Sequence, residues 1–562
     1  MTAEMTYTGS DLLVQALRDE GVDTMFGYPG GAIIPVFDTL YRKHFNTLLV
    51  RHEQGAAHAA EGYAKSTGRP GVLMVTSGPG ATNAITGIAD AQRDSVPMVV
   101  FTGQVGTGAI GHDAFQEVNV LDLMTPVTKH TYQFKTTEKI PAVIHEAFAL
   151  AKGGRPGPVV IDMPKDLMTG TVNELPDAKP APAPAPRQAD QATVEQVAKA
   201  FAEAKRPLVV IGNGAVGAGA EQEVNTLVHK FQLPFATTLL GLGVVPSEDE
   251  FFLGMGGMHG SYAANQALEE ADFVLGIGVR FEDRFATKPD KFTPKATLVQ
   301  IDVDPNEKNR NVNADFALEG DARAVLNQFL GAVESTTPHQ EWLDQVAAWN
   351  QERPFAYQDD EGSFAPEAVI KEIGRQTQAR AYVVTDVGQH QMWAAQFYPF
   401  TFPRQLITSG GFGTMGFGIP AAIGTQSAHR DDQVVLFTGD GSLQMTSEEL
   451  DVASQYNLNL KVVLFNNQRL GMVRQWQDLF FAKRRAMTVL DHQPNFAKLA
   501  DAYGFDYRDL DLNGDWQAQI ARFLQKPGPG MLEVQVDPDH QAMPMIFPGN
   551  SNGELYDENY DN

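Results

Sequence analysis

The chain of 562 residues is 43% hydrophobic and 20% charged, a composition typical of globular proteins, and its length predicts about two to four domains. The absence of cysteine excludes disulfides and thiolate metal sites, and no apolar run of about 18 residues is present to span a membrane. The net charge of −26 disfavours nucleic acid as a partner, because phosphate backbones attract basic surfaces.

The first third of the chain alternates short apolar runs with amphipathic segments. Residues 1–21 lack the basic and apolar regions of a signal peptide, so we expect a cytoplasmic protein. Apolar, β-branched runs at residues 71–78, 96–103 and 157–164 are typical of strands buried on both faces of a parallel sheet. We therefore predict a first α/β domain at residues 1–172.

Within this domain, Glu53 stands directly before a segment rich in small residues, from Gly55 to Ala64. Small side chains allow a helix to pack closely against another backbone, and a carboxylate beside such a surface is expected to be buried. Taken alone, the segment at residues 51–54 is equally compatible with a cluster of surface charges.

Two linkers divide the rest of the chain. Pro and Ala alternate at residues 173–188, which predicts a stiff, extended segment. A polar helical stretch and an acidic turn-rich stretch at residues 336–364 predict a second linker. Between and after them, at residues 189–335 and 365–562, apolar runs again alternate with amphipathic segments. The sequence therefore predicts an α/β protein of three doubly wound parallel-sheet domains.

The third domain carries the strongest chemical signal. Gly439, Asp440 and Gly441 follow one predicted strand, and Asn467 follows the next strand, 27 positions after Asp440. Both strands of a βαβ unit end at the same edge of a sheet, where a carboxylate and an amide oxygen can share Mg²⁺. The two glycines let a diphosphate approach the backbone, and the helix that starts near Ser442 favours an anion.

This pattern resembles the thiamin diphosphate binding motif, and further segments resemble acetohydroxyacid synthase (acetolactate synthase) catalytic subunits along essentially the whole chain. The matching segments are residues 26–40, 51–64, 76–91, 113–117, 154–166, 280–284, 385–396, 413–424 and 466–477. The resemblance implies decarboxylation of pyruvate and ligation of the two-carbon unit to a second 2-ketoacid. Pyruvate would give 2-acetolactate and 2-ketobutyrate would give 2-aceto-2-hydroxybutyrate, the shared early steps towards valine, leucine and isoleucine.

The resemblance also implies how thiamin diphosphate is held. Asp440, Asn467 and the backbone carbonyl of Arg469 would bind Mg²⁺. Glu53 would hydrogen-bond N1′ of the aminopyrimidine, and an apolar surround would raise the pKa of its carboxyl group towards neutral pH. Met415 would hold the cofactor in its bent shape. Further cofactor contacts are expected from Gln389, His390, Gly413, Gly439, Gly441, Ser442, Gly471 and Met472.

Substrate contacts follow from the same resemblance. Gly30 and Gly31 would form a tight turn near the aminopyrimidine. The other implied substrate residues are Phe115 and Gln116 facing the reacting carbon, Met472, Val473 and Trp476 shaping the second-substrate site, and Lys165 and Arg280 at the channel mouth.

A redox-idle FAD is implied in the central domain. Residues 212–217, GNGAVG, fit the dinucleotide-binding fingerprint, although that match alone is weak. Glu282 departs from the aspartate usual in the family. The residues expected to hold FAD are Arg155, Gly257, Met258, His259, Gly278, Arg280, Glu282, Arg284 and Asp302.

The family resemblance implies partners as well. Glu53 and the diphosphate site would come from different subunits, so we expect a homodimer or a homotetramer, and a small regulatory subunit is a possible partner. We expect no membrane partner.

Four alternatives were weighed against this assignment. They are a flavin-dependent pyruvate oxidase, a catabolic acetolactate synthase without FAD, a decarboxylase that releases aldehyde, and an inactive scaffold of the same fold. Phe115 and Gln116 favour carboligation over oxidation, and Arg155 favours the FAD-binding synthase. His112 stands where the resemblance leads us to expect Thr or Ser, and its role stays open. The acceptor preference, the choice between dimer and tetramer and the need for FAD stay open as well.

Overall fold

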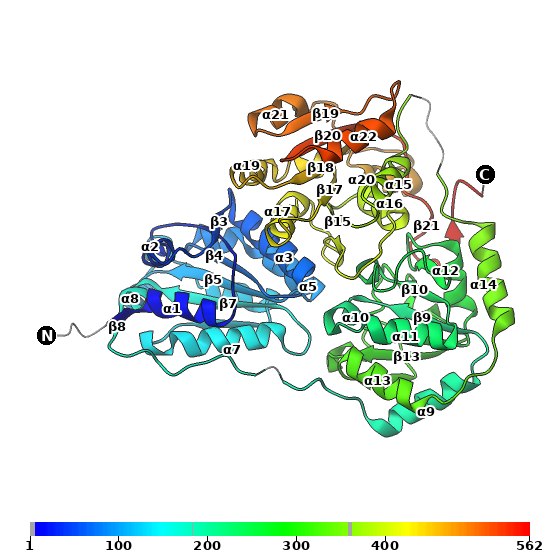
Figure 1. The fold of residues 1–562 in the computed structure, drawn as a ribbon, viewed down its shortest axis with the longest axis horizontal. Coiled ribbons are helices and arrows are strands. Elements are labelled where there is room, and N and C mark those ends of the chain that lie inside the picture. Colours follow the sequence, from blue (N-terminus) through cyan, green and yellow to red (C-terminus); the bar gives the residue numbers. More distant parts are fainter. Residues whose placement is uncertain (1–5, 183, 358–361, 562) are drawn as a thin grey trace.

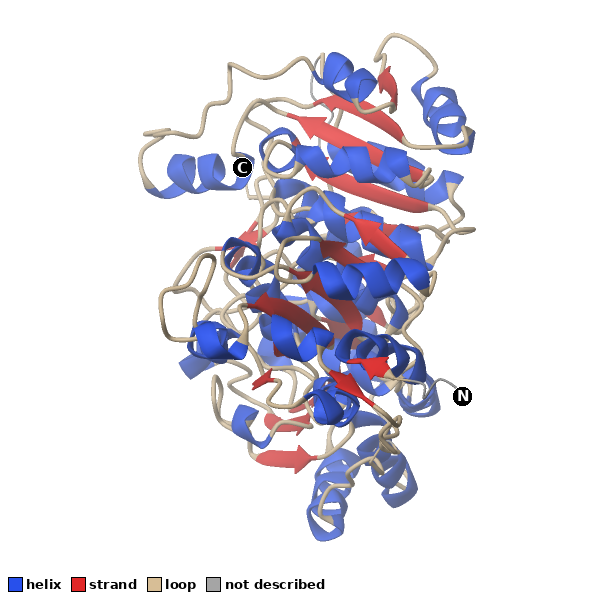
Figure 2. Cartoon of the chain, turned by 90° about the vertical axis from the view of Figure 1, so that its left-hand side faces the viewer, coloured by secondary structure: helices blue, strands red, loops and turns tan. Residues whose placement is uncertain are grey.

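The computed structural model describes residues 6–182, 184–357 and 362–561, and it shows three units, each built on a six-stranded sheet. In Figure 1 the N-terminal unit, in blue and cyan, lies on the left, the central unit, in green, at the lower right, and the C-terminal unit, in yellow to red, at the top. Figure 2 shows the strands lying between layers of helices. The predicted fold class, three doubly wound parallel-sheet domains, is confirmed.

The N-terminal unit contains these elements: β1 (Tyr7–Thr8), α1 (Gly9–Asp19), β2 (Met25–Tyr28), α2 (Ile34–Arg42), β3 (Thr47–Leu49), α3 (Glu53–Thr67), β4 (Gly71–Val75), α4 (Pro79–Asn83), α5 (Ile85–Asp94), β5 (Met98–Gln104), α6 (Val120–Met124), β6 (His130–Gln133), α7 (Ile140–Lys152), β7 (Pro158–Pro164), α8 (Lys165–Thr169) and β8 (Thr171–Val172). Strands β1 and β8 pair antiparallel beside the main sheet.

The central unit contains α9 (Gln191–Glu203), β9 (Pro207–Ile211), α10 (Asn213–Ala218), α11 (Glu221–Phe231), β10 (Phe235–Thr237), β11 (Phe252–Met255), α12 (Tyr262–Glu270), β12 (Phe273–Ile277), β13 (Thr297–Asp302), β14 (Phe316–Glu319) and α13 (Ala322–Ala332). The helix α14 (Gln340–Glu352) follows it.

The C-terminal unit contains α15 (Pro366–Gln376), β15 (Tyr382–Thr385), α16 (Gln389–Phe397), β16 (Leu406–Ile407), α17 (Gly418–Ala428), β17 (Val434–Gly439), α18 (Asp440–Leu443), the 3₁₀ helix η7 (Ser447–Glu449), α19 (Leu450–Gln455), β18 (Leu460–Asn466), α20 (Gly471–Phe480), α21 (Phe496–Ala502), β19 (Asp506–Asp509), α22 (Trp516–Gln525) and β20 (Gly530–Gln535). A last pair, β21 (Met545–Ile546) and β22 (Leu555–Tyr556), is antiparallel.

The first and third sheets share one topology. Their strand orders are β3-β2-β4-β5-β7-β6 and β16-β15-β17-β18-β20-β19, and every neighbouring pair in both is parallel. The central sheet, β11-β10-β9-β12-β13-β14, has the strand order of dinucleotide-binding domains. In such sheets ligands bind at the carboxyl ends of the strands, so three edges are candidate sites.

The helices α3 and α17 join the N-terminal and C-terminal units by backbone contact. A Cβ atom on Gly62 would lie 2.1 Å from the carbonyl oxygen of Ala421, and one on Gly424 would lie 1.8 Å from that of Ala59. Residues of both helices belong to one buried hydrophobic cluster that spans the two units. The expectation that the small residues of this segment serve close helix packing is confirmed.

A buried ionic cluster reinforces this contact. The Lys65 ammonium donates to Asp94 over 2.6 Å and to the carbonyl of Thr408 over 2.5 Å, and it lies 3.3 Å from Glu61. Asp94 also accepts the backbone N–H groups of Gly410 and Gly411, at 2.9 and 2.7 Å. The cluster therefore ties helices of the N-terminal unit to the loop that leads into α17.

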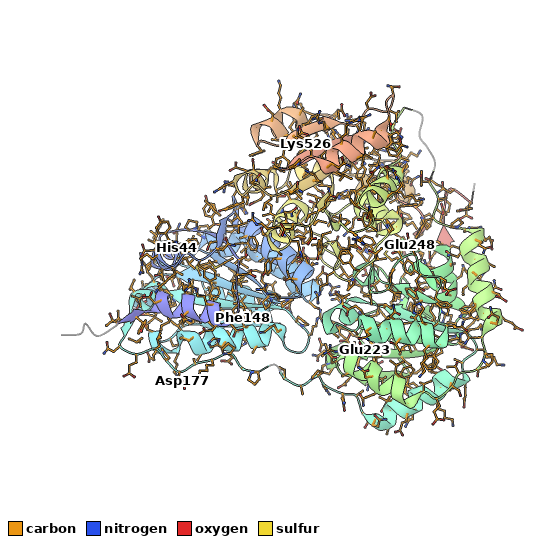
Figure 3. The ribbon with its side chains drawn as sticks, in the orientation of Figure 1. His44, Phe148, Asp177, Glu223, Glu248 and Lys526 are labelled. Atoms are coloured by element: carbon orange, nitrogen blue, oxygen red, sulfur yellow. The ribbon has the colours of Figure 1, made fainter. Side chains whose placement is uncertain are left out.

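The segments predicted as linkers differ in structure. Asp177, labelled in Figure 3, lies on the extended first linker at the lower edge of the view. The second predicted linker contains α14, whose Trp342 donates from Nε1 to the Pro207 carbonyl over 2.9 Å and packs in the central core. Residues 183 and 358–361 of the two linkers lie outside the described residues. No helix in the described ranges has the length and apolar character needed to cross a membrane.

Candidate active site

The predicted metal ligands lie on neighbouring strands of the C-terminal sheet. Asp440 follows β17 and Asn467 follows β18, and these strands pair in parallel. Asp440 is buried and accepts a hydrogen bond from Gln493, and burial raises the pKa of its carboxyl group to about 7. Asn467 accepts the backbone N–H of Arg469 over 3.0 Å. A buried carboxylate beside an amide oxygen is a donor set that suits a hard cation such as Mg²⁺.

A cavity opens at this edge of the sheet. Its lining residues are Val387, Gly388, Gln389, His390, Trp393, Met415, Gly439, Asp440, Gly441, Ser442, Phe465, Asn467, Arg469, Leu470, Gly471, Met472 and Val473. A Cβ atom on Gly471 would lie 2.0 Å from Oε1 of Gln389, and one on Gly441 would lie 2.7 Å from Leu470. Glycine at both positions thus keeps backbone close to the ligand space.

Gln389 and His390 begin α16 above the cavity. Gln389 donates to Gln475 over 2.8 Å and to the His540 carbonyl over 2.9 Å, and it accepts from Asn467 over 3.3 Å. Burial lowers the pKa of His390 to about 3, so the ring is neutral. Its buried Nε2 atom has no hydrogen-bond partner among the described residues. This unpaired nitrogen can bind a polar ligand such as a diphosphate.

Met415 reaches the cavity from the loop that precedes α17. The backbone N–H groups of Gly416 and Gly418 each donate to the buried Asp386 carboxylate over 2.9 Å. Ser442 donates to the Val387 carbonyl over 3.1 Å, which joins the two strand ends. Gly413, in the same loop, has a φ of +72°, a conformation that favours glycine. The Met415 side chain is therefore presented by a hydrogen-bonded loop.

A second group of predicted residues gathers at the carboxyl edge of the N-terminal sheet. Glu53 is the first residue of α3, and its Oε2 accepts from Asn83 over 3.0 Å. Gly30 packs against Thr76, to which a Cβ atom would come within 2.5 Å, while Gly31 borders open space. These residues come from three different strand ends and form one half of a site.

In the single chain, Glu53 is not buried among the small residues that follow it. Glu53 is partly exposed, because the first turn of α3 projects from the sheet edge while the small residues face α17 further along the helix. The fully buried carboxylate on this helix is Glu61. Burial of Glu53 would require a second surface placed over the edge.

Phe115 and Gln116 lie on a loop of the N-terminal unit, and Lys165 follows β7 as the first residue of α8. Phe115 is 88% exposed, although it is a large apolar residue. Gln116 has a φ of +61°, a left-handed conformation that is uncommon for non-glycine residues. A Cβ atom on Gly78 would lie 2.8 Å from the Gln116 carbonyl oxygen, so the two loops touch. Lys165 begins α8 and is exposed.

The residues around Glu53 do not line the cavity beside Asp440. Among the described residues, the lining of the cavity beside Asp440 includes none from the N-terminal unit. Glu53 and Asp440 thus stand at the carboxyl ends of two different sheets in the single chain, and Glu53 lies outside the lining of this cavity.

Trp476 connects α20 with the central unit. The Arg284 guanidinium lies 5.7 Å from the centre of the Trp476 ring and donates to the Met258 sulfur over 3.1 Å. Val473, one turn earlier, is 50% exposed. His259 is buried beside the Pro544 carbonyl, and burial lowers its pKa to about 4. The Trp476 end of α20 thus packs against the central unit and the C-terminal segment.

The carboxyl edge of the central sheet carries the glycine-rich motif. Gly212 follows β9 and Gly278 follows β12, the neighbouring strands at which the chain direction across the sheet switches. The N–H of Gly214 donates to the Gly278 carbonyl over 3.1 Å, and Gly257 has a φ of +93°. Burial raises the pKa of Asp302, at the end of β13, to about 6. The position and the close backbone approach suit a dinucleotide.

Three charged residues predicted to contact FAD form hydrogen bonds or ion pairs between the N-terminal and central units. Arg155 of the N-terminal unit donates to Glu307 over 2.7 Å and to Asp304 over 3.4 Å. Arg280 donates to the Arg93 carbonyl over 2.7 Å. Glu282 lies 3.4 Å from the Arg93 guanidinium and 3.5 Å from that of Arg280.

Sequence reasoning missed several side chains that hold these groups. Gln493 contacts Asp440 from a loop more than fifty positions away, and no local pattern marks it. Gln475 and Asp386 act through buried hydrogen bonds. Asn83 lies in the segment at residues 76–91, which resembles the family, but its contact with Glu53 depends on tertiary structure.

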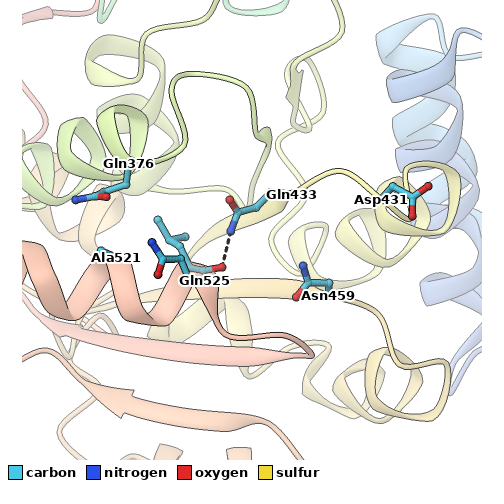
Figure 4. Close-up of a pocket in the computed structure, with 7 residues that line it drawn as sticks. Gln376, Asp431, Gln433, Asn459, Ala521 and Gln525 are labelled. Carbon is cyan, nitrogen blue, oxygen red and sulfur yellow. Dashed lines mark hydrogen bonds between the residues drawn. The ribbon is translucent and has the colours of Figure 1, made fainter.

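Another hollow lies at the opposite edge of the C-terminal sheet and is shown in Figure 4. Its lining residues are Gln376, Asp431, Gln433, Asn459, Ala521, Leu524 and Gln525. Gln433 donates across it to the Leu524 carbonyl over 3.0 Å. It lies at the amino ends of the strands, whereas the predicted metal ligands lie at their carboxyl ends.

Comparisons with known proteins agree with this geometry. Residues 7–123, 194–329 and 386–534 match family models described as the N-terminal TPP binding, central, and C-terminal TPP binding domains of thiamine pyrophosphate enzymes. The acetolactate synthase large subunit of Lactococcus lactis is 46% identical over 98% of this chain and 96% of its own length. The acetolactate synthase isozyme 3 large subunit of Escherichia coli is 42% identical, and the Haemophilus influenzae large subunit 41% identical, each over 98% of both chains.

Proposed function

Because the chain belongs to the acetolactate synthase large subunits of the thiamine pyrophosphate enzymes, we propose that it decarboxylates pyruvate and joins the remaining two-carbon unit to a second 2-ketoacid. The products are 2-acetolactate from pyruvate and 2-aceto-2-hydroxybutyrate from 2-ketobutyrate. The reaction belongs to the biosynthesis of valine, leucine and isoleucine. The observation that carries the proposal is the pair Asp440 and Asn467 on neighbouring strand ends beside the cavity, in a chain similar to these relatives along its whole length.

Thiamin diphosphate, when bound, supplies the carbon nucleophile and the electron sink for decarboxylation. Asp440, Asn467 and the carbonyl of Arg469 hold Mg²⁺, which neutralises the diphosphate. His390 would offer its unpaired Nε2 to the same ligand, and Met415, which lines the cavity, would support the bound cofactor. The glycines that line the cavity would let the backbone approach the diphosphate closely.

Glu53 would hold N1′ of the aminopyrimidine by a hydrogen bond and could exchange a proton with it. A carboxylate suits this role only where water is excluded, since bulk water would compete for the hydrogen bond. The partial exposure of Glu53 and its absence from the lining of the Asp440 cavity support a site closed by a second copy of the chain. We therefore propose a homodimer, or a homotetramer built from such dimers, as the active form.

The remaining site residues act on substrates and on FAD. Phe115 and Gln116 close over the reacting carbon, with Gly30 and Gly31 beside it, and Trp476 bounds the acceptor. Lys165 and Arg280 attract ketoacid carboxylates against the negative net charge.

A redox-idle FAD at the central sheet edge is part of the proposal, and the support is the glycine contact beyond β9 and β12 and the half-buried Asp302. The residues that would contact FAD are Arg155, Gly257, Met258, His259, Gly278, Arg280, Glu282, Arg284 and Asp302. The relatives are named large subunits, and we propose that this chain likewise binds a small regulatory subunit. We place the protein in the cytoplasm.

A product assay tests the function. Purified apoprotein receives pyruvate, Mg²⁺ and thiamin diphosphate, with and without FAD, and 2-acetolactate, acetaldehyde, acetate and peroxide are quantified. We expect 2-acetolactate that requires FAD. Formation without any bound flavin would favour the catabolic type, and acetate with peroxide would replace the proposal with a pyruvate oxidase.

A further inference from the structure

Glu449 is a buried carboxylate that the reaction outlined above does not use. It ends η7, nine positions after Asp440, and its side chain is inaccessible to solvent. Its Oε1 accepts the backbone N–H of Arg51 over 3.0 Å and that of His52 over 2.9 Å. Both donors directly precede Glu53. The C-terminal unit thus holds the backbone from which the Glu53 side chain projects.

The first turn of α3 has room for this carboxylate because residue 55 is glycine. A Cβ atom on Gly55 would lie 2.1 Å from Oε1 of Glu449. Any side chain at that position would displace the carboxylate or the helix. The helix N-terminus also favours a negative group, since its N–H groups point towards it.

Neighbouring contacts restrain the same loop. Asp451 accepts from Arg51 Nε over 2.7 Å, and Tyr456 accepts the backbone N–H of Leu49 over 2.8 Å. The Arg51 guanidinium and Asp451 are partly exposed, so their ion pair contributes little rigidity. The two hydrogen bonds to Glu449 are part-buried and end on a carboxylate that solvent does not reach, and their loss would leave two N–H groups without a protein partner.

We propose that Glu449 is a positioning residue that fixes Glu53 for proton exchange with the cofactor, which rests on the function and the Glu53 role proposed above. A displacement of about 1 Å in a reacting group can lower the rate by about 100-fold. The C-terminal unit of a chain would in this way set the geometry of that chain's own N-terminal half-site.

The test compares Glu449→Ala with Glu449→Gln, which keeps the accepting oxygen. We expect Glu449→Ala to lower kcat for 2-acetolactate by about 100-fold, with the KM for pyruvate and the retention of Mg²⁺ and thiamin diphosphate unchanged. Glu449→Gln should stay within about tenfold of wild type. The matched control is Glu448→Ala, which removes the adjacent carboxylate and should leave kcat unchanged.

Two further readouts separate positioning from general stability. In the apoprotein, amide hydrogen exchange at Arg51 and His52 should accelerate at least about tenfold in Glu449→Ala and stay unchanged in Glu448→Ala. In a Glu53→Gln background, Glu449→Ala should lower kcat by less than about threefold, because a group that acts through Glu53 has nothing left to position.

Normal kcat in Glu449→Ala, or full additivity with Glu53→Gln, would overturn the proposal. If Glu449→Ala does not fold, Gly55→Ala provides the same test, since its methyl group displaces Oε1 and should lower kcat with the cofactor retained. Wild-type protein that makes no 2-acetolactate would instead refute the proposed function. The hydrogen exchange result, and the rate of C2 proton exchange on bound thiamin diphosphate, would then still decide whether Glu449 positions Glu53.

Discussion

The two carboxylates that the proposed reaction needs, Asp440 and Glu53, differ in how far solvent reaches their side chains. Asp440 is buried in a cavity whose donor atoms suit a cation, whereas Glu53 stands partly exposed at another sheet edge. The spacing of Asp440 and Asn467 predicts their shared edge, because strand order and chain direction are local consequences of the βαβ pattern. The exposure of Glu53 could not be predicted in this way, since it depends on which surface covers the edge.

Glu53→Gln should lower kcat for 2-acetolactate by about 100-fold or more, because the amide cannot accept a proton from the aminopyrimidine. Binding of Mg²⁺ and thiamin diphosphate, measured by calorimetry, should be nearly unchanged. Glu138→Gln, an exposed carboxylate of the same unit, serves as the control. Near-normal turnover in Glu53→Gln would remove Glu53 from the mechanism.

Asp440→Ala should weaken Mg²⁺-dependent binding of thiamin diphosphate by about 100-fold or more, because the cation loses its only charged ligand in the proposed set. The measurement is the cofactor content after gel filtration, together with the dissociation constant. Asp431→Ala, at the opposite edge of the same sheet, should retain the cofactor (Figure 4). Unchanged affinity in Asp440→Ala would show that the metal assignment is wrong.

At the scale of elements, the packing of α3 on α17 was predictable in kind from the small residues between Gly55 and Ala64. The helix that these small residues contact could not be predicted, because α17 lies more than 350 positions later in the sequence. The buried cluster of Glu61, Lys65 and Asp94 shows the same limit. Glu61 and Lys65 are four positions apart on α3, but Asp94 ends α5, and no local pattern indicates that the three side chains meet.

Gly424→Ala tests this packing, since the added methyl group would meet the Ala59 carbonyl at 1.8 Å. We expect a loss of about 1–3 kcal/mol in the free energy of unfolding, read as a lower Tm. Gly331→Ala in α13 is the matched control, because its Cβ would meet no atom within 4 Å. It should be neutral or slightly stabilising, and equal effects of the two variants would contradict the close contact.

Glu61 should make stability depend on pH. Burial raises its pKa from the ordinary 4.5 to about 8, although Lys65 is close. The folded chain then holds a proton that the unfolded chain has released, so stability present below pH 4.5 is lost as the pH rises through 8. Glu61→Gln should therefore show a smaller fall in Tm between pH 5 and pH 8.5 than the wild type, in buffers of about equal ionic strength. Parallel Tm curves would contradict the shift.

At the scale of the whole molecule, the three-domain α/β architecture follows from the repeated alternation of apolar runs and amphipathic segments. The common strand order of the first and third sheets does not follow from that alternation, because strand order depends on the crossover connections and not on the composition of the strands. The separation of the half-sites is also a property of the whole chain. It links the candidate site to assembly, since one copy alone brings no residue of the N-terminal unit to the described cavity.

The measurement that tests this account most directly is 2-acetolactate formation by mixed subunits. Glu53→Gln and Asp440→Ala chains are produced separately, and then together in equal amounts. If each site takes Glu53 from one copy and Asp440 from the other, random pairing restores one intact site in half of the dimers, about a quarter of wild-type activity. Mixed chains no more active than the separate variants would contradict a site shared between two copies, and would require Glu53 and Asp440 to act within one chain.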